Sequence, residues 1–284
     1  MVKSLKAHPV ITFYILAFVL AWCIKVPVSL SNTNNILFRL LPSFFPAIAA
    51  LITAAIIAGK HGVGDLLKQA GKLRVSPVWY LIALVGPMAL NLLALVLAVP
   101  FGEPFPGIAF AGIRLLPVFL IATFSGLGEE LGWRGFALPR LQDRFNPVVA
   151  SLIVGLLWWA WHLPDALTGP ARGLSLQQDI SLELRDLVQD LAISILMAWI
   201  YNGTNRSVLL ATLFHVGIGL LQEFLAIPNT PHVSVMDILL SVALWIAAVT
   251  VVLASRRAPL AYRQSETPET AALLANNSSD TAIG

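Results

Sequence analysis

The residues that could do chemistry gather in one stretch, residues 124–136, which reads Phe-Ser-Gly-Leu-Gly-Glu-Glu-Leu-Gly-Trp-Arg-Gly-Phe. Its charged members are Glu129, Glu130 and Arg134, within an otherwise apolar run. An ionisable group at bilayer depth costs roughly 2.5–3.5 kcal/mol, so it usually faces the protein interior and marks a functional path. On a helix Glu130 and Arg134 stand four residues apart and can pair, whereas Glu129 points about 100° away. Glu129 is then free for a reaction; the alternative is a buried structural ion network of all three.

Two histidines interrupt other apolar segments: His162 within 158–164 and His215 within 213–217. A lone histidine in a membrane helix is more often a packing or hydrogen-bonding residue than a catalyst. Three separate segments that each contribute an ionisable group favour a hydrolytic site. In such a site a glutamate acts as general base on water, and a histidine serves as oxyanion donor or metal ligand.

Composition identifies the kind of molecule that must position these groups. The chain has 284 residues, of which 57% are hydrophobic and 12% charged, against about 25% charged in soluble domains. This predicts an all-α, polytopic membrane protein, with the lipid bilayer as a partner. The net charge of +3 does not indicate nucleic-acid binding, because the basic residues flank apolar segments. Cys23 is the only cysteine, which excludes an internal disulfide and a cysteine-rich metal site.

A membrane span needs about 20 mostly apolar residues. Eight segments approach that length: 9–30, 36–59, 77–100, 113–138, 147–163, 187–202, 207–226 and 234–255. With the N-terminus inside, twelve of the eighteen Lys and Arg residues fall on the inner side, so we expect both termini of this integral membrane protein to be cytoplasmic. We expect one membrane domain over 1–255, a solvated polar loop over 164–186, and a disordered cytoplasmic tail over 256–284.

The spacing of these motifs resembles the CPBP family, which comprises type II CAAX prenyl endopeptidases and bacterial bacteriocin-processing, immunity and abortive-infection-like membrane proteins. The resemblance covers about residues 113–225. It is carried by Glu-Glu-x-x-x-Arg over 129–134, an aromatic residue four positions before His162, and His215. The segments Gly-Phe-Ala-Leu-Pro-Arg-Leu over 135–141 and His-Leu-Pro over 162–164 also look like the family.

The resemblance implies a role for each matched residue. Glu129 would activate the attacking water with help from His162, Glu130 and Arg134 would organise the site, and His215 would stabilise the oxyanion. Family members have also been described as metalloproteases. A divalent ion such as zinc, held by Glu129, His162 and His215, therefore stays open beside a metal-free mechanism.

The chain departs from the family pattern at two positions. Trp158 stands where the second motif usually has Phe, and Gly219 stands four residues after His215, where the family usually has Asn. Glycine has no side-chain donor, so one oxyanion contact is lost or supplied elsewhere. Gln222 lies seven residues beyond His215 on the same helical face and is the candidate replacement. We expect Trp158 and Gln222 to contact the substrate.

The function expected from the sequence is that of an intramembrane endopeptidase, acting on a membrane-associated protein or peptide, of which a prenylated CAAX-type substrate is one candidate. The main alternative is a non-catalytic relative that acts as a bacteriocin-immunity factor or as a membrane-protein assembly or export factor. A transporter that moves protons through Glu129 and the histidines is a further alternative, but the chain has no paired internal repeats of the kind many transporters show.

Overall fold

The structure is a computed structural model that describes residues 2–31, 35–105, 112–168, 173–225, 227 and 230–255. All of its secondary structure in these ranges is helical, as the composition predicts. The predicted tail over 256–284 lies outside the described residues.

Eight long helices correspond to the eight apolar segments of the sequence. They are α2 (Pro9–Ser31), α4 (Phe45–Ala70), α5 (Pro77–Ala98), α6 (Gly112–Glu130), α8 (Pro147–His162), α9 (Leu176–Gly203), α10 (Val208–Phe224) and α11 (Val235–Ser255). The short elements between them are α1 (Val2–Ala7), α3 (Ile36–Leu40), α7 (Leu138–Gln142), the 3₁₀ turns Leu41–Phe44, Val99–Phe101 and Leu163–Thr168, and a π-helix, Leu131–Ala137.

Five of the helical stretches in the described ranges are long and apolar enough to cross a membrane. They cover Pro9–Ser31, Ile36–Ala70, Pro77–Phe101, Pro147–Ala166 and Val235–Ser255. The remaining long helices depart from a simple span for different reasons. Helix α10 has 17 residues, fewer than the roughly 20 that a bilayer requires, whereas α6 and α9 carry acidic residues in their sequences. The chain is an all-α polytopic membrane protein.

The expectation of a solvated loop over 164–186 is wrong from residue 176 onward. Helix α9 begins at Leu176 and continues for 28 residues, so its first half is helical despite its polar composition. A capping box starts it: the Ser175 side chain accepts from the backbone N–H of Gln178, and the Gln178 side chain accepts from the backbone of Ser175. This pair satisfies two of the backbone donors that a helix N-terminus exposes.

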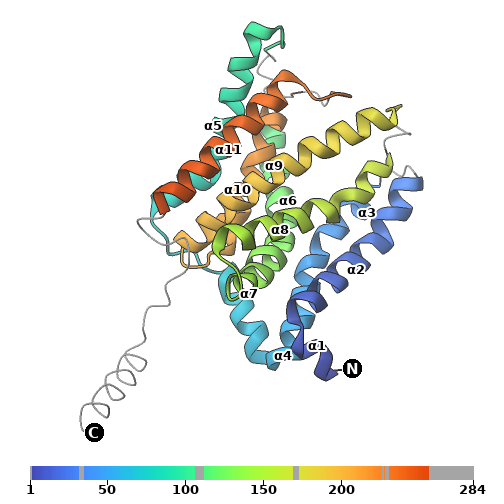
Figure 1. The fold of residues 1–284 in the computed structure, drawn as a ribbon, viewed down its shortest axis with the longest axis vertical. Helices are drawn as coiled ribbons and strands as arrows, with labels where there is room; N and C mark the ends of the chain where they lie inside the picture. The colour runs from blue at the N-terminus through green and yellow to red at the C-terminus, as the bar shows by residue number, and fades with distance from the viewer. Residues whose placement is uncertain are drawn as a thin grey trace.

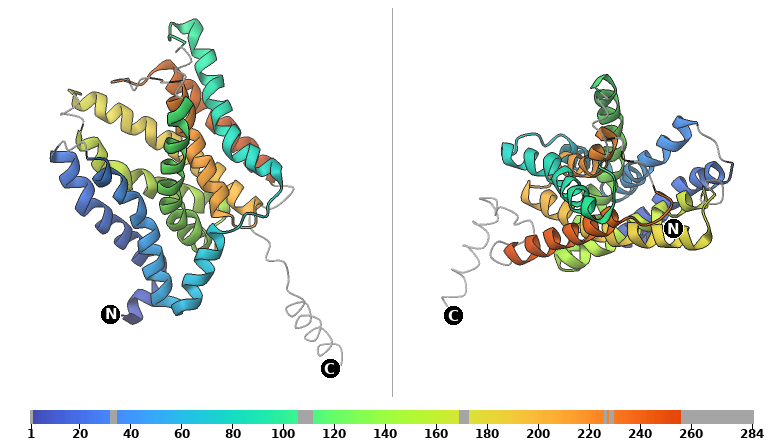
Figure 2. Two further views of the ribbon diagram at one scale, coloured as in Figure 1. Left: turned by 180° about the vertical axis from the view of Figure 1, so that it is seen from behind. Right: turned by 90° about the horizontal axis from the view of Figure 1, so that it is seen from above.

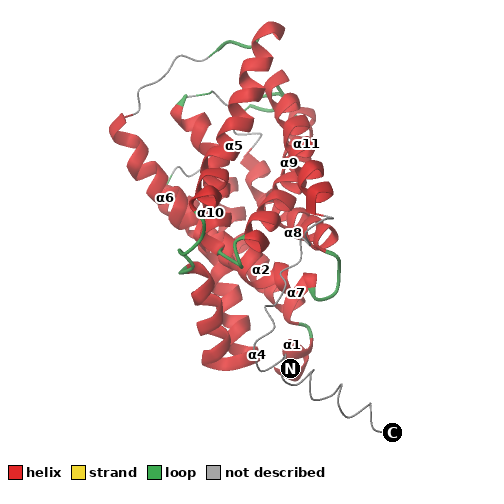
Figure 3. Cartoon of the chain, turned by 90° about the vertical axis from the view of Figure 1, so that its left-hand side faces the viewer, coloured by secondary structure: helices red, strands yellow, loops and turns green. Residues whose placement is uncertain are grey.

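The helices enclose the stretch that carries the glutamates. Helix α6 lies between α4 and α10 when the molecule is seen from behind (Figure 2), and α10 also packs against α5 and α9. Helix α8 packs along α9, and α2 packs along α4 (Figure 1). Figure 3 shows the same bundle with α6 and α10 side by side. Consequently, α6 delivers its C-terminal end to the interior of the bundle.

That end of α6 passes directly into the π-helix Leu131–Ala137, every residue of which is buried. The wide turn is held against α4 at close range: a Cβ added at Gly132 would lie 2.7 Å from backbone atoms of Pro46. Such π-helical turns are rare in proteins as a whole, but those that occur often lie at functional sites. This close packing against α4 buries the segment that follows the two glutamates.

Candidate active site

Glu130 is the centre of a charge cluster in which its own carboxylate and the Arg134 guanidinium are fully buried. One guanidinium nitrogen of Arg134, Nη1, lies 3.0 Å from both Glu130 carboxylate oxygens, and both side chains are 0% exposed. His215 on α10 reaches the same carboxylate, with its Nδ1 3.0 Å from Oε1. The pairing of Glu130 with Arg134 predicted from their spacing is therefore present, and His215 joins it from a different helix.

Glu129 has different partners. Its Oε2 accepts a hydrogen bond of 2.9 Å from Nε1 of Trp158, and Nε2 of His162 lies 3.9 Å from the same oxygen. Glu129 is 5% exposed, so its carboxylate is almost wholly removed from solvent. The two adjacent glutamates therefore have different partners. Glu130 contacts an arginine and a histidine, whereas Glu129 contacts an indole and a second histidine.

Trp158 lies close to both histidines. Its ring centroid is 5.1 Å from that of His215 and 6.1 Å from that of His162. The guanidinium carbon of Arg134 lies 5.0 Å from the Trp158 ring, within the range of a cation–π contact. The aromatic residue of the second motif therefore connects the Glu129 side of the cluster with the Glu130 side.

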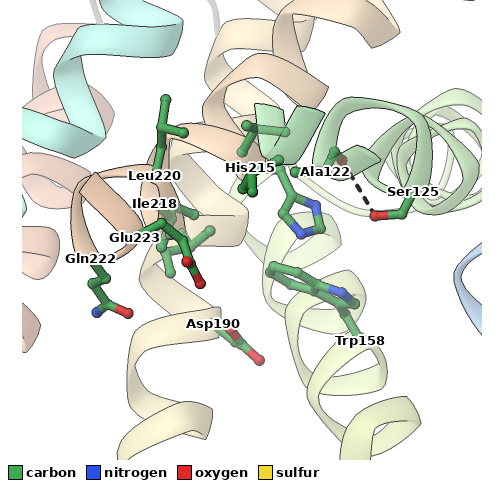
Figure 4. A pocket seen from close by; sticks show the side chains of 13 residues that line it. Ala122, Ser125, Trp158, Asp190, His215, Ile218, Leu220, Gln222 and Glu223 are labelled. Carbon is green, nitrogen blue, oxygen red and sulfur yellow. Dashed lines mark hydrogen bonds between the residues drawn. The ribbon is translucent and has the colours of Figure 1, made fainter. Parts of the chain in front are cut away.

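A cavity of about 390 Å³ opens beside this cluster. Figure 4 shows His215 and Trp158 in its wall, with Ser125 of α6 nearby. Gln222 also lines the cavity, but its amide lies on the opposite side and points away from His215 (Figure 4). Gly219 lines the cavity too, and a Cβ added there would meet nothing within 4 Å.

The sequence reasoning missed four residues of this region. Ser125 and Asp190 line the cavity, while Lys25 and Asp165 contact His162. Signals for two of them were present in the sequence: Lys25 is a charge inside an apolar segment, and Asp165 follows His162 by three residues, one helical turn. Asp190 belongs to the polar half of α9 and Ser125 to an apolar helix, so nothing in the sequence singled them out.

The predicted metal set is brought together only in part. Glu129 and His162 approach each other, whereas the Nδ1 of His215 is directed to Glu130. Across the described ranges, no three His, Cys, Asp or Glu side chains form a group that could hold a metal ion. In this arrangement His215 bonds to Glu130 and does not complete a three-ligand set with Glu129 and His162.

Two sequence comparisons relate this chain to known proteins. Residues 111–221, which include both histidines and the two glutamates, match the family model described as Type II CAAX prenyl endopeptidase Rce1-like. The chain is also 28% identical over 262 residues to CAAX prenyl protease 2 of Methanococcus maripaludis, a match that covers 86% of this chain and 94% of the relative. The similarity extends over nearly the whole membrane domain, well beyond the motifs. Both matches support the assignment of the chain to the CPBP family of CAAX prenyl endopeptidase-like membrane proteins.

Proposed function

We propose that this protein is an intramembrane endopeptidase in which Glu129 activates the attacking water. The observation that carries the proposal is that the two adjacent glutamates have different bonding partners. Glu130 is neutralised by Arg134 and bonded to His215, whereas Glu129 faces His162 and the indole of Trp158. In the part of the chain that the structure describes, no Lys or Arg side chain bonds to Glu129. A buried carboxylate of this kind beside an imidazole can act as a general base.

The distance between Glu129 and His162 suits one water molecule. Their facing atoms are 3.9 Å apart, too far for a direct hydrogen bond but close enough for a single water oxygen about 2.8 Å from each. Glu129 takes a proton from that water while the water oxygen attacks the peptide carbonyl carbon. The tetrahedral intermediate then collapses, the C–N bond breaks, and the proton passes to the leaving amine. The products are a new carboxylic acid and a new amine.

His215 is the proposed oxyanion donor. Its Nδ1 is committed to the Glu130 carboxylate at 3.0 Å, so Nε2 can donate to an oxyanion only when the ring is an imidazolium. Negative charge on Glu130 favours that form, and Arg134 fixes the Glu130 carboxylate in place. Because Gln222 points away from His215, we propose Ser125 of the same cavity wall as a second donor. Its hydroxyl would turn to the oxyanion from the Ala122 carbonyl, to which it donates at 3.3 Å.

The proposed substrate is a membrane-associated protein with a prenylated CAAX-type C-terminus. The relative from Methanococcus maripaludis is named CAAX prenyl protease 2, and prenylation places such a C-terminus at the bilayer surface. Apolar side chains such as Val118, Ile193 and Leu220 line the same cavity as His215. This mixture of apolar and polar walls suits a lipidated peptide.

The test is hydrolysis of a fluorogenic prenylated CAAX peptide by the purified protein in detergent or liposomes. We expect turnover by the wild type and a loss of at least about 100-fold in Glu129→Gln, the range of a general base. The matched control is Glu103→Gln. The Glu103 carboxylate accepts from the backbone N–H of Val235, a contact that glutamine preserves, so this variant should keep wild-type turnover.

Two other results would redirect the assignment. Absence of turnover over a broad panel of lipidated and unlipidated peptides would favour the non-catalytic immunity or assembly role, which the lack of an Asn side chain at position 219 would explain. Turnover that stops with a chelator and returns with zinc would replace the metal-free mechanism by a metal-dependent one.

A further inference from the structure

Lys25 is a charged residue inside the first membrane helix that the reaction above does not use. Its side chain is 7% exposed, and it enters from α2, far in sequence from the motifs. Its Nζ lies 2.7 Å from Oδ2 of Asp165 and 3.3 Å from Nδ1 of His162. Lysine at bilayer depth is costly and is usually retained for a function.

Asp165 completes a three-residue cluster on the far side of the imidazole from Glu129. Its Oδ2 lies 3.1 Å from Nδ1 of His162, while the other ring nitrogen, Nε2, is the atom that faces Glu129. One carboxylate oxygen therefore contacts both the lysine ammonium and the imidazole. The Lys25 ammonium also lies 3.8 Å from the centroid of the Trp161 ring, which limits its freedom to move.

We propose that Lys25 and Asp165 are positioning residues that fix the orientation and the tautomer of His162, an inference that rests on the proposed function. Lysine has donors only, and a carboxylate has acceptors only. The 3.1 Å contact of Asp165 with Nδ1 is shorter than the 3.3 Å contact of Lys25 with the same nitrogen. In the proposed arrangement the proton lies on Nδ1 and is donated to Asp165, so that the lone pair lies on Nε2.

This tautomer gives the attacking water a defined orientation. With two acceptors facing it, the carboxylate of Glu129 and Nε2 of His162, the water donates both of its hydrogens and turns a lone pair toward the substrate carbonyl. The opposite tautomer would place its N–H, in place of an acceptor, against the water and leave one of the water hydrogens undirected. A carboxylate that holds an imidazole through Nδ1–H plays the same part in serine hydrolases.

Lys25 acts one step further from the reaction. Without its ammonium, the Asp165 carboxylate loses an ionic partner at 2.7 Å that helps to hold it at the ring. Both residues therefore affect the reaction through His162, without contact with the water. Their substitution should lower kcat and leave KM unchanged.

The experiment compares Asp165→Asn, Lys25→Met and the double variant in the peptide assay. We expect kcat to fall about 10- to 100-fold in each single variant, the range found for side chains that orient a ligand or base. The double variant should fall no further than the worse single one, because both act on one ring. Lys25→Arg, which keeps the charge, should recover most of the rate.

An exposed pair of the same residue types provides the matched control. Lys68 and Asp65 form a 3.0 Å salt bridge with side chains 76% and 71% exposed, and the variants Lys68→Met and Asp65→Asn should keep wild-type kcat. The tautomer is read separately by ¹⁵N NMR of histidine-labelled protein, with His162 assigned by the signal that disappears in His162→Gln. We expect a protonated Nδ1 in the wild type and a changed Nδ1 signal in Asp165→Asn.

The outcomes separate this inference from the proposed function. Wild-type kcat in Asp165→Asn and Lys25→Met, with Glu129→Gln inactive, would overturn the positioning role and leave the protease intact. A protonated Nε2 in the wild type would overturn the tautomer. Full activity in Glu129→Gln would instead remove the proposed function itself.

Discussion

Removal of the Arg134 guanidinium should destabilise the protein far more than an ordinary core substitution. Arg134 and Glu130 are both 0% exposed, and one nitrogen lies 3.0 Å from both carboxylate oxygens. Two unit charges at that distance attract by about 5.5 kcal/mol at an effective dielectric constant of about 20. In Arg134→Met the carboxylate would remain buried, with His215 as its one bonded basic side chain among the described residues. Loss of one partner of a buried pair costs about 3–5 kcal/mol, so we expect that loss here.

The double variant Glu130→Gln with Arg134→Met provides the decisive comparison. Glutamine is neutral and keeps an oxygen that can accept from His215, so the buried charge disappears and stability should return to within about 1–2 kcal/mol of the wild type. The assay is thermal unfolding in one detergent, followed by tryptophan fluorescence. At roughly 2–4 °C per kcal/mol, Arg134→Met should unfold roughly 6–20 °C below the wild type. If the double variant unfolded as early as Arg134→Met, the loss would come from packing, and the reasoning from charge would be refuted.

Three further substitutions test single contacts. Gly219→Asn should raise turnover about tenfold or more, because one oxyanion donor contributes a factor of about 10²–10³ to kcat and nothing lies within 4 Å of a Cβ at this position. Gly219→Ala, which adds no donor, should leave the rate unchanged. Trp158→Phe removes the indole N–H bonded to the reacting glutamate and should lower kcat, whereas Trp159→Phe, whose indole bonds to a backbone carbonyl of α9, should not; equal losses would contradict a specific role. Gly132→Ala would place a Cβ 2.7 Å from the backbone of α4 and should lower stability by about 1–3 kcal/mol, measured by thermal unfolding, while Gly86→Ala, where nothing lies within 4 Å, should not destabilise.

Much of the fold could be predicted because its signals are local. Each apolar segment of roughly 20 residues becomes a helix, since backbone groups in a bilayer must be satisfied within the segment. The capping box at Ser175 is equally local, yet the polar composition of residues 176–186 favours a solvated loop, whereas in the structure α9 begins at Leu176. Composition indicated the environment of those residues and not their backbone conformation.

In the candidate site, too, local contacts could be predicted from the sequence and contacts between helices could not. The i,i+4 spacing determined that Glu130 pairs with Arg134, and the motif spacing identified the family. The choice of partner for each histidine lay outside the reach of the sequence. Only the packing of α10 and α8 against α6 directs His215 to Glu130 and His162 to Glu129.

By itself, the sequence determined which residue types are present, that they lie among membrane helices, and which pairs one helical turn brings together. Only the tertiary structure decided that Lys25 reaches Asp165 and His162 across about 140 residues of chain, and that Gln222 turns away from the cavity wall that holds His215. The physical reason is that helical periodicity specifies neighbours within a turn. Contacts between helices depend on how close their backbones approach, and here that approach is set by small residues such as Gly132.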